Sequence, residues 1–301
     1  MTLSPYEVAL LAEAEARPEV VVLTAENRAA LRALPARLGP RFVDVGICEQ
    51  TLVGAAAGLA LGGRIPVVHA LATFLTMRAF EFIRSDVGLA RLPVKLVGAV
   101  PGLLSGANGP THQAIEDLGL MRLVPGMEIF CLADEEELVA GLPHAIASPR
   151  PVYVRHVATP ARYWHKPFTW GRAEVVGAGC DVAVISAGYL VGEAWDALVA
   201  LRKDGVEGRL VNLRTVAPLD EAAVLAAARA ARLLVTVEDH LLTGGVHSAV
   251  VELLSRTGVA ARVLPLALSG PFAAAPLPAA LEREEFTALQ LARRISAAIE
   301  R

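Results

Sequence analysis

Six short, mostly apolar runs recur through the first half of the chain, separated by segments with helical spacing. They are residues 20–23, 42–45, 65–70, 93–98, 127–132 and 151–155. Short apolar runs of this kind are typical of strands covered on both faces. Strands that alternate with helices pair in parallel through right-handed crossovers. The pattern therefore predicts a mostly parallel sheet flanked by helices.

A second series of the same kind begins at residue 181, with strands predicted at residues 181–188, 209–213, 233–238 and near 262–264. The residues between the two series are rich in Pro, Tyr and Trp, which predicts an ordered linker whose rings pack between domains. We therefore predict an α/β protein of two domains, each a mostly parallel sheet flanked by helices. The expected boundaries are residues 1–158 and 179–301, with a linker over residues 159–178.

Charge and composition exclude several classes of function. The net charge is −3 and no block of Lys or Arg appears, so neither nucleic acid nor an acidic membrane is an expected partner. No uncharged apolar run reaches the roughly 18 residues of a membrane span. Cys48, Cys131 and Cys180 match no zinc spacing and are typical of a reducing compartment, and the first residues lack a signal-peptide pattern. These features predict a cytoplasmic protein.

The stretch from residue 46 to residue 112 holds the main candidates for chemistry. Glu49 follows the strand predicted at residues 42–45 and precedes a run of small apolar residues at 51–61. That run predicts a helix too apolar to face water on any side, so Glu49 is expected to be buried at its start. A buried carboxylate must be paired, hydrogen-bonded or neutralised. Glu49 therefore either caps its helix through backbone amides or holds a ligand.

Three further residues have both a functional and a structural interpretation. His112 lies in a Gly-rich loop after a predicted strand, where open α/β sheets bind ligands, but Thr111 beside it is also a plausible helix cap. Phe74 follows a strand and fits a core position more readily than a stacking platform. Arg155 ends the strand at 151–155 and either clamps an anionic substrate or forms a salt bridge with a neighbouring acid.

The segment Glu-Asp-His at residues 238–240, with Thr-Gly-Gly at 243–245, resembles an acid–base cluster before a phosphate-binding turn. It lacks the Lys and the spacing of a P-loop, so a structural turn is the favoured interpretation. Several other motifs are missing from the sequence: G-x-G-x-x-G, G-x-S-x-G, a dense Asp/His metal cluster, and a Gly-Asp-Gly…Asn segment that holds a Mg²⁺-diphosphate.

Taken together, the motifs resemble the C-terminal half of transketolase, the thiamine diphosphate enzyme, in the order of that family and over nearly the whole chain. The matching segments are Asp-Val-Gly-Ile-Cys-Glu-Gln at 44–50, Ala-Thr-Phe-Leu at 72–75, Gly-Pro-Thr-His-Gln at 109–113 with Ile-Glu-Asp at 115–117, Pro-Val-Tyr-Val-Arg at 151–155, and Val-Glu-Asp-His at 237–240 with Gly-Gly at 244–245. The resemblance implies a pyrimidine-binding domain followed by a transketolase C-terminal-like domain.

The resemblance also implies roles for individual residues. Glu49 would hydrogen-bond N1′ of the cofactor's aminopyrimidine, which favours the imino tautomer that removes the proton from the thiazolium C2. Phe74 would stack on the pyrimidine and Phe80 would line its pocket. His112 would contact substrate oxygens or carry a proton, and Arg155 would hold a sugar phosphate.

Two positions depart from the family pattern. Transketolases usually carry His where Val100 stands and Asp where Asn108 stands, and both residues are thought to contact the hydroxyl groups of the sugar. Asn108 remains a candidate substrate contact. Loss of an imidazole and a carboxylate would change recognition of the usual ketose, because polar site groups discriminate by pairing with hydroxyls.

The predicted protein is thus the second chain of a split transketolase-like enzyme. It would transfer a two-carbon ketol unit between sugar phosphates, as in pentose phosphate metabolism. A partner chain would bring the diphosphate-binding domain and most of the ligands to Mg²⁺ or Ca²⁺, with a homodimer core within a heterotetramer. The alternatives are a deoxyxylulose-phosphate synthase-like enzyme, a 2-oxo acid dehydrogenase beta-type subunit, or a non-catalytic partner subunit of the same fold.

Overall fold

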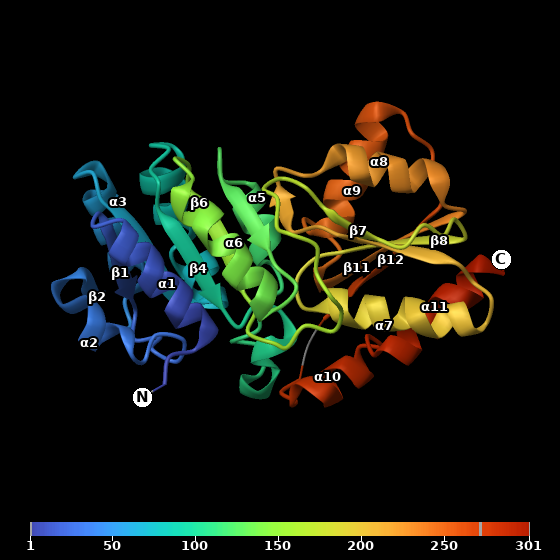
Figure 1. The fold of residues 1–301 in the computed structure, drawn as a ribbon, viewed down its shortest axis with the longest axis horizontal. Coiled ribbons are helices and arrows are strands. Elements are labelled where there is room, and N and C mark those ends of the chain that lie inside the picture. Colours follow the sequence, from blue (N-terminus) through green and yellow to red (C-terminus); the bar gives the residue numbers. More distant parts are fainter. Residues whose placement is uncertain (1, 271–272, 301) are drawn as a thin grey trace.

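Two sheets, each covered by helices on both faces, lie side by side in the computed structural model, which describes residues 2–270 and 273–300 (Figure 1). The first sheet has the order β10-β5-β6-β4-β3-β1-β2 and the second the order β12-β11-β8-β9-β7. All pairings are parallel except β10 with β5 and β7 with β9. The predicted fold class is confirmed.

The strands of the first sheet are buried, as the apolar runs predicted. Every residue of β1, β4, β5 and β6 is inaccessible or nearly so. The strands of this sheet are β1 (Val20–Thr24), β2 (Phe42–Asp44), β3 (Ile65–Leu71), β4 (Lys95–Ala99), β5 (Glu128–Cys131), β6 (Val152–His156) and β10 (Thr215–Ala217). Alternate residues of β1 pack on opposite faces: Val20 and Val22 on one, Val21 and Leu23 on the other.

The helices of the first domain form two layers. On one face lie α1 (Pro5–Ala16), α2 (Leu34–Leu38) and α6 (Glu135–Ala147). On the other lie α3 (Glu49–Leu61), α4 (Phe80–Phe82) with the π-helical turns Phe74–Arg78 and Ile83–Gly88 on either side of it, and α5 (Asp117–Arg122). Most of the segment from residue 74 to residue 88 thus forms π-helical turns, which are frequent at functional sites.

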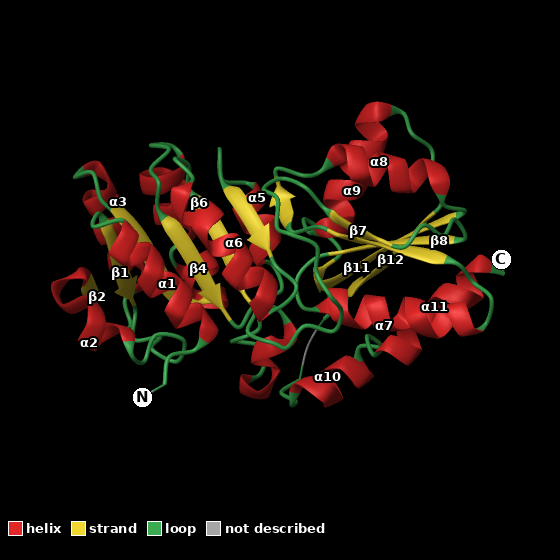
Figure 2. Cartoon of the chain, viewed as in Figure 1, coloured by secondary structure: helices red, strands yellow, loops and turns green. Residues whose placement is uncertain are grey.

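The second sheet lies between α8 and α9 on one side and α7 and α11 on the other (Figure 2). Its strands are β7 (Glu174–Val176), β8 (Val182–Ser186), β9 (Gly208–Asn212), β11 (Leu233–Leu241) and β12 (Val263–Leu268). Its helices are α7 (Leu190–Lys203), α8 (Glu221–Ala230), α9 (Val246–Thr257), α10 (Leu277–Arg283) and α11 (Ala288–Ile299).

The two domains are joined by more than the linker. β7 lies inside the range expected to be linker and pairs with β9 in the second sheet, while β10 leaves the second domain and pairs with β5 in the first. One hydrophobic core runs from α3 through α5 to α8 and α9. The two sheets are therefore held together by shared strands and a shared core.

The helix after β2 differs from its prediction in one respect. Leu52, Val53 and Ala56 of α3 are buried, but Thr51, Ala55 and Gly58 are exposed and Leu61 keeps 75% of its surface accessible. In the single chain α3 therefore shows one apolar, small-sided face to solvent. Within the described residues no helix is both long and apolar enough to cross a membrane.

Candidate active site

Glu49 is the first residue of α3, and its side chain is buried, with 2% of the residue exposed. Gly46 in the preceding turn has a φ of +76°, a conformation that glycine adopts without strain. The turn brings Glu49 back beneath the segment after β3, where its Oε2 accepts a hydrogen bond from Nη1 of Arg78 at 2.7 Å. Among the described residues no backbone amide donates to this carboxylate, so Glu49 does not cap its helix.

Arg78 also contacts Phe74, and Phe74 in turn contacts His112. Its guanidinium carbon lies 4.4 Å from the centre of the Phe74 ring, and that ring meets the His112 imidazole edge-on at a centroid distance of 5.1 Å. Phe74 and Arg78 are the two ends of one π-helical turn, and His112 comes from the loop after β4. Glu49, Phe74 and His112, far apart in the sequence, are thus brought together at one place.

Arg78 was not among the predicted site residues. Residues four apart in a helical segment lie on the same face, so Arg78 could have been found from Phe74. Phe80, in contrast, packs partly buried against the core that runs under α3. Asn108 ends a short 3₁₀ turn, and its side chain is exposed. Neither residue makes a described contact with Glu49, Phe74 or His112.

Arg155 requires a correction. Its side chain is 1% exposed, its Nε and Nη2 donate to the two oxygens of Asp117 at 2.8 and 3.0 Å, and its Nη1 donates to Asp239 at 2.7 Å. Burial lowers the pKa of this guanidinium, but Asp117 and Asp239 raise it well above its usual range. A phosphate could reach Arg155 only by displacing two buried carboxylates. The salt-bridge alternative is therefore the one that the structure has.

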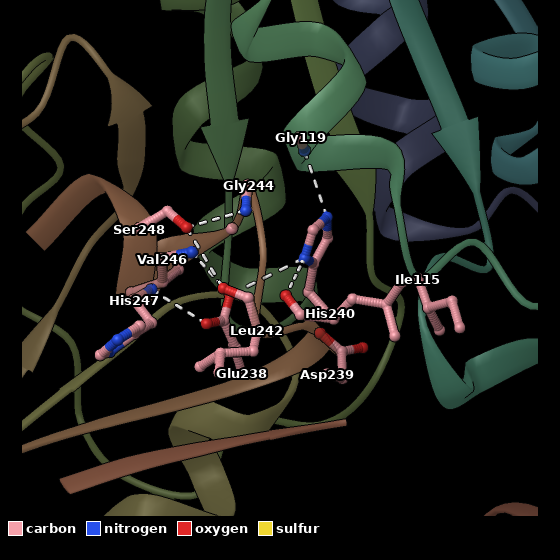
Figure 3. A network of polar contacts seen from close by, with 12 residues as sticks. Ile115, Gly119, Glu238, Asp239, His240, Leu242, Gly244, Val246, His247 and Ser248 are labelled. Atoms are coloured by element: carbon pink, nitrogen blue, oxygen red, sulfur yellow. Dashed lines mark hydrogen bonds and ion pairs between the residues drawn. The ribbon is translucent and has the colours of Figure 1, made fainter. Parts of the chain in front are cut away.

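The segment at residues 238–240 also joins the domains (Figure 3). Nε2 of His240 accepts a hydrogen bond from the backbone amide of Gly119 at 3.2 Å, and Nδ1 of the same ring lies 2.6 Å from its neighbour's carbonyl oxygen. The Glu238 carboxylate accepts from the amides of Val246 and His247, at 2.6 and 2.9 Å, at the start of α9. Burial raises the pKa of Glu238 to about 7. The segment thus holds helix starts in place and makes no described contact with Glu49, Phe74 or His112.

A cavity of about 680 Å³ opens at the carboxyl ends of β3, β4 and β6. Its lining includes Leu71, Val100, Leu104, His156, Asn27 and Arg32. Val100 has a φ of +46°, which is strained for a β-branched residue and is typical of functional sites. Burial lowers the pKa of His156 to about 4, so its imidazole is uncharged at neutral pH. Leu104 of the lining belongs to the loop that also carries His112, but the cluster of Glu49, Phe74, Arg78 and His112 does not line this cavity.

The cluster fits the aminopyrimidine of thiamine diphosphate. A ligand there must donate to the buried Glu49 carboxylate and stack on Phe74, and the planar, hydrogen-donating guanidinium of Arg78 already does both. The residues therefore present the acceptor and the aromatic face that such a ring needs.

One group among the described residues could offer three ligands to a metal ion, namely Glu137, His165 and Glu174. Arg214 pairs with both glutamates, at 2.6 and 3.2 Å. Burial lowers the pKa of His165, but hydrogen bonds to Asp134 and Glu174 raise it to about 10. The imidazole is then a cation at neutral pH and pairs with the carboxylates of Asp134 and Glu174. This group fastens the linker to both domains.

Comparisons with known proteins agree with the two-domain division. The family "Transketolase, pyrimidine binding domain" matches residues 2–157, and "Transketolase, C-terminal domain" matches residues 171–290. The 6-deoxy-6-sulfo-D-fructose transketolase subunit SqwH of Clostridium sp. (strain MSTE9) is 35% identical over 254 residues, which are 83% of this chain and 79% of that protein.

Two further relatives differ in how much of their length this chain matches. The 1-deoxy-D-xylulose-5-phosphate synthase of Dictyoglomus turgidum is 37% identical over 85% of this chain, but that match spans only 42% of the synthase. A solved structure, described as "Split gene transketolase, inactive beta4 tetramer", superposes with a TM-score of 0.89 at 33% identity and covers 98% of this chain and 97% of its own. The matched residues thus span most of these transketolase subunits and less than half of the synthase.

Proposed function

The chain belongs to the transketolase family, and from that premise we propose that it is one subunit of a split, thiamine diphosphate-dependent enzyme that transfers a two-carbon ketol unit between sugar phosphates. The observation that carries the proposal is the convergence of Glu49, Phe74 and His112 on Arg78. These residues come from three separate segments, and each offers a contact that the pyrimidine end of the cofactor or its substrate needs.

Each residue has a separate task in this mechanism. The bound cofactor supplies the carbanion and the electron sink. Glu49 would share a proton with N1′ of the aminopyrimidine, and its burial strengthens that hydrogen bond because water does not compete for it. Phe74 would fix the plane of the ring. His112, half-buried at the edge of Phe74, would donate to a substrate oxygen.

The diphosphate and Mg²⁺ are proposed to be held mainly by a partner chain. Two findings support this assignment: the sequence lacks a Gly-Asp-Gly…Asn segment, and two relatives that it matches over most of their length are described as a transketolase subunit and a split gene transketolase. The structural relative that consists of beta chains alone is described as inactive. The exposed small-sided face of α3 offers a contact surface of the kind that close helix packing needs, and we propose that it is buried in a homodimer core within a heterotetramer.

The cavity at the carboxyl ends of β3, β4 and β6 is proposed to take the part of the sugar remote from the reacting carbons. Arg32 is its one cation among the described lining residues, and within 4 Å of it the described chain offers no carboxylate. Arg32 is therefore the candidate contact for a terminal phosphate, a role that buried Arg155 does not take. Val100, where the family usually has His, makes this part of the cavity apolar.

The test is Glu49→Gln in the enzyme reconstituted from both chains. The variant keeps the volume and one hydrogen bond but cannot take up the N1′ proton, so ketol transfer is expected to fall by at least 100-fold, within the range typical of general acid–base catalysis. Assembly with the partner, measured by sedimentation, should be unchanged. Turnover equal to that of the wild type would support the non-catalytic subunit instead.

A deoxyxylulose-phosphate synthase-like activity is the second candidate, and the identity to that enzyme favours it. The donor separates the two reactions, because a synthase of that type condenses a decarboxylated 2-oxo acid whereas ketol transfer starts from a ketose. Carbon dioxide release from pyruvate by the reconstituted pair, without transfer from a ketose phosphate, would indicate a 2-oxo acid donor. Condensation of the decarboxylated fragment with an aldehyde phosphate would then establish the synthase. The same measurement tests the 2-oxo acid dehydrogenase beta-type alternative.

A further inference from the structure

Arg78 makes two contacts, and both of them involve groups that the aminopyrimidine would need. It donates to the Glu49 carboxylate at 2.7 Å and lies over the Phe74 ring at 4.4 Å from its centre. A pyrimidine that hydrogen-bonds the same carboxylate oxygen and stacks on the same face of Phe74 would fill the same space. In that position the guanidinium and the pyrimidine exclude one another.

We propose that Arg78 is an internal plug: in the free chain it occupies the place of the aminopyrimidine, and it must swing out before that ring can bind. This inference rests on the proposed cofactor but assigns a role to a residue that the proposed function does not use. It applies to the thiamine-type aminopyrimidine as a ligand class.

The charges explain why the free chain needs such a plug. Glu49 is buried, and a buried carboxylate without a cation or donor costs several kcal/mol. Arg78 is the one described group that donates to it. In the free chain Arg78 therefore keeps the ionised carboxylate compensated, and the proton at N1′ of the pyrimidine would take over that task on binding.

The surroundings of Arg78 allow it to leave. Its side chain is 41% exposed, in contrast to the buried Arg155, so it can move into solvent without opening the core. It also ends a π-helical turn, a kind of turn that is frequent at functional sites. Phe74 at the other end of the turn stays in place as the stacking surface.

The experiment uses the full chain and the probe 4-amino-5-aminomethyl-2-methylpyrimidine, which carries the ring of the cofactor without its diphosphate. The variants are Arg78→Met, which keeps an unbranched chain without the charge, and Arg84→Met as the matched control. Arg84 lies in the next turn, is exposed, and has no described ion pair. Calorimetric titration gives the dissociation constant of each protein.

Removal of the plug is expected to tighten binding of the probe by about tenfold or more, whereas Arg84→Met should bind like the wild type. An affinity that is unchanged or weaker in Arg78→Met would overturn the proposal. Absence of binding to all three proteins would overturn it as well. The proposed function is judged separately, by the turnover of the reconstituted Glu49→Gln enzyme.

A second measurement follows Arg78 itself in the wild-type chain and does not depend on how the variant folds. The Nη–H resonance of a guanidinium that is fixed by an ion pair and a ring is shifted and exchanges more slowly with water than that of a solvated arginine. Addition of the probe should move this resonance to the position of a solvated arginine, while that of Arg155 stays unchanged. An Arg78 signal that persists at saturation would show that ring and guanidinium bind together, and would refute the plug.

Discussion

Replacement of Arg155 by Met is expected to destabilise the chain far more than the loss of a surface ion pair. The guanidinium is buried, spans the junction between the domains, and makes three hydrogen bonds of 2.7 to 3.0 Å to Asp117 and Asp239. Both carboxylates are as inaccessible as the arginine. The methionine would fill most of the space but leave two buried negative charges without a cation.

Removal of one partner from a buried ion pair typically costs 3–5 kcal/mol, and we expect a loss of about 4 kcal/mol here. Arg256→Met provides the matched control, because Arg256 pairs with Glu221 at a similar 2.7 Å but is 63% exposed. Exposed pairs of this kind contribute roughly 0–1 kcal/mol. Urea unfolding followed by circular dichroism, with linear extrapolation to water, measures both differences.

A third variant tests the cause. Arg155→Met combined with Asp117→Asn and Asp239→Asn removes the charges together, so it should recover a large part of the stability that Arg155→Met alone loses. If Arg155→Met lowers the free energy of unfolding no more than Arg256→Met, the buried guanidinium does not stabilise the junction between the domains. A substrate-binding role for Arg155 would then have to be reconsidered.

Three further perturbations have outcomes fixed by the structure. Gly102→Ala should lower the free energy of unfolding clearly more than Gly258→Ala in the same assay. Both glycines have positive φ, but a Cβ at Gly102 would clash with the Asp239 carboxylate, whereas a Cβ at Gly258 meets open space; equal losses would refute this interpretation. His165→Gln should lower the free energy of unfolding most below pH 6.5, and this loss should disappear as the pH rises through 10. The reason is that the raised folded-state pKa of His165 stabilises the fold only while the ring is protonated. A pH-independent difference in unfolding midpoint would contradict this prediction. Arg32→Ala should raise KM for a sugar phosphate about tenfold, which corresponds to the loss of one charge-assisted hydrogen bond. KM for the unphosphorylated sugar should stay unchanged in the same steady-state assays. Equal changes in both KM values would show that Arg32 does not bind the phosphate.

Strand positions were predictable because local patterns determine them. Residues 20–23 and 151–155 are apolar on both faces, and the structure has β1 and β6 there with every residue buried. β10 was not predictable, since its three residues pair with β5 on the basis of contacts far away in the sequence. The π-helical turns at Phe74–Arg78 and Ile83–Gly88 carry ordinary helix-forming residues, so composition cannot distinguish them from a regular helix.

The candidate site divides in the same way. The burial of Glu49 followed from the small-residue run after it, and the structure agrees. The partner of Arg155 could not be chosen from the sequence, because Asp239 lies 84 residues away and many acids were equally plausible. Likewise, the sequence could not show that α3 keeps an exposed face, since that depends on whether another surface covers it.

The pairing of buried acids separates structural groups from the candidate site. Arg155 and Arg214 are as buried as the carboxylates they neutralise, so neither side of the pair can exchange its partner without opening the core. Glu193 is buried beside the half-exposed Arg162, but the amide of Ala288 also donates to it, so it stays hydrogen-bonded if Arg162 leaves. Glu49 combines a buried carboxylate with a single described donor, and that donor is half-exposed. An acid held in this way must receive another donor when Arg78 moves, which is the property expected of a group that binds a ligand.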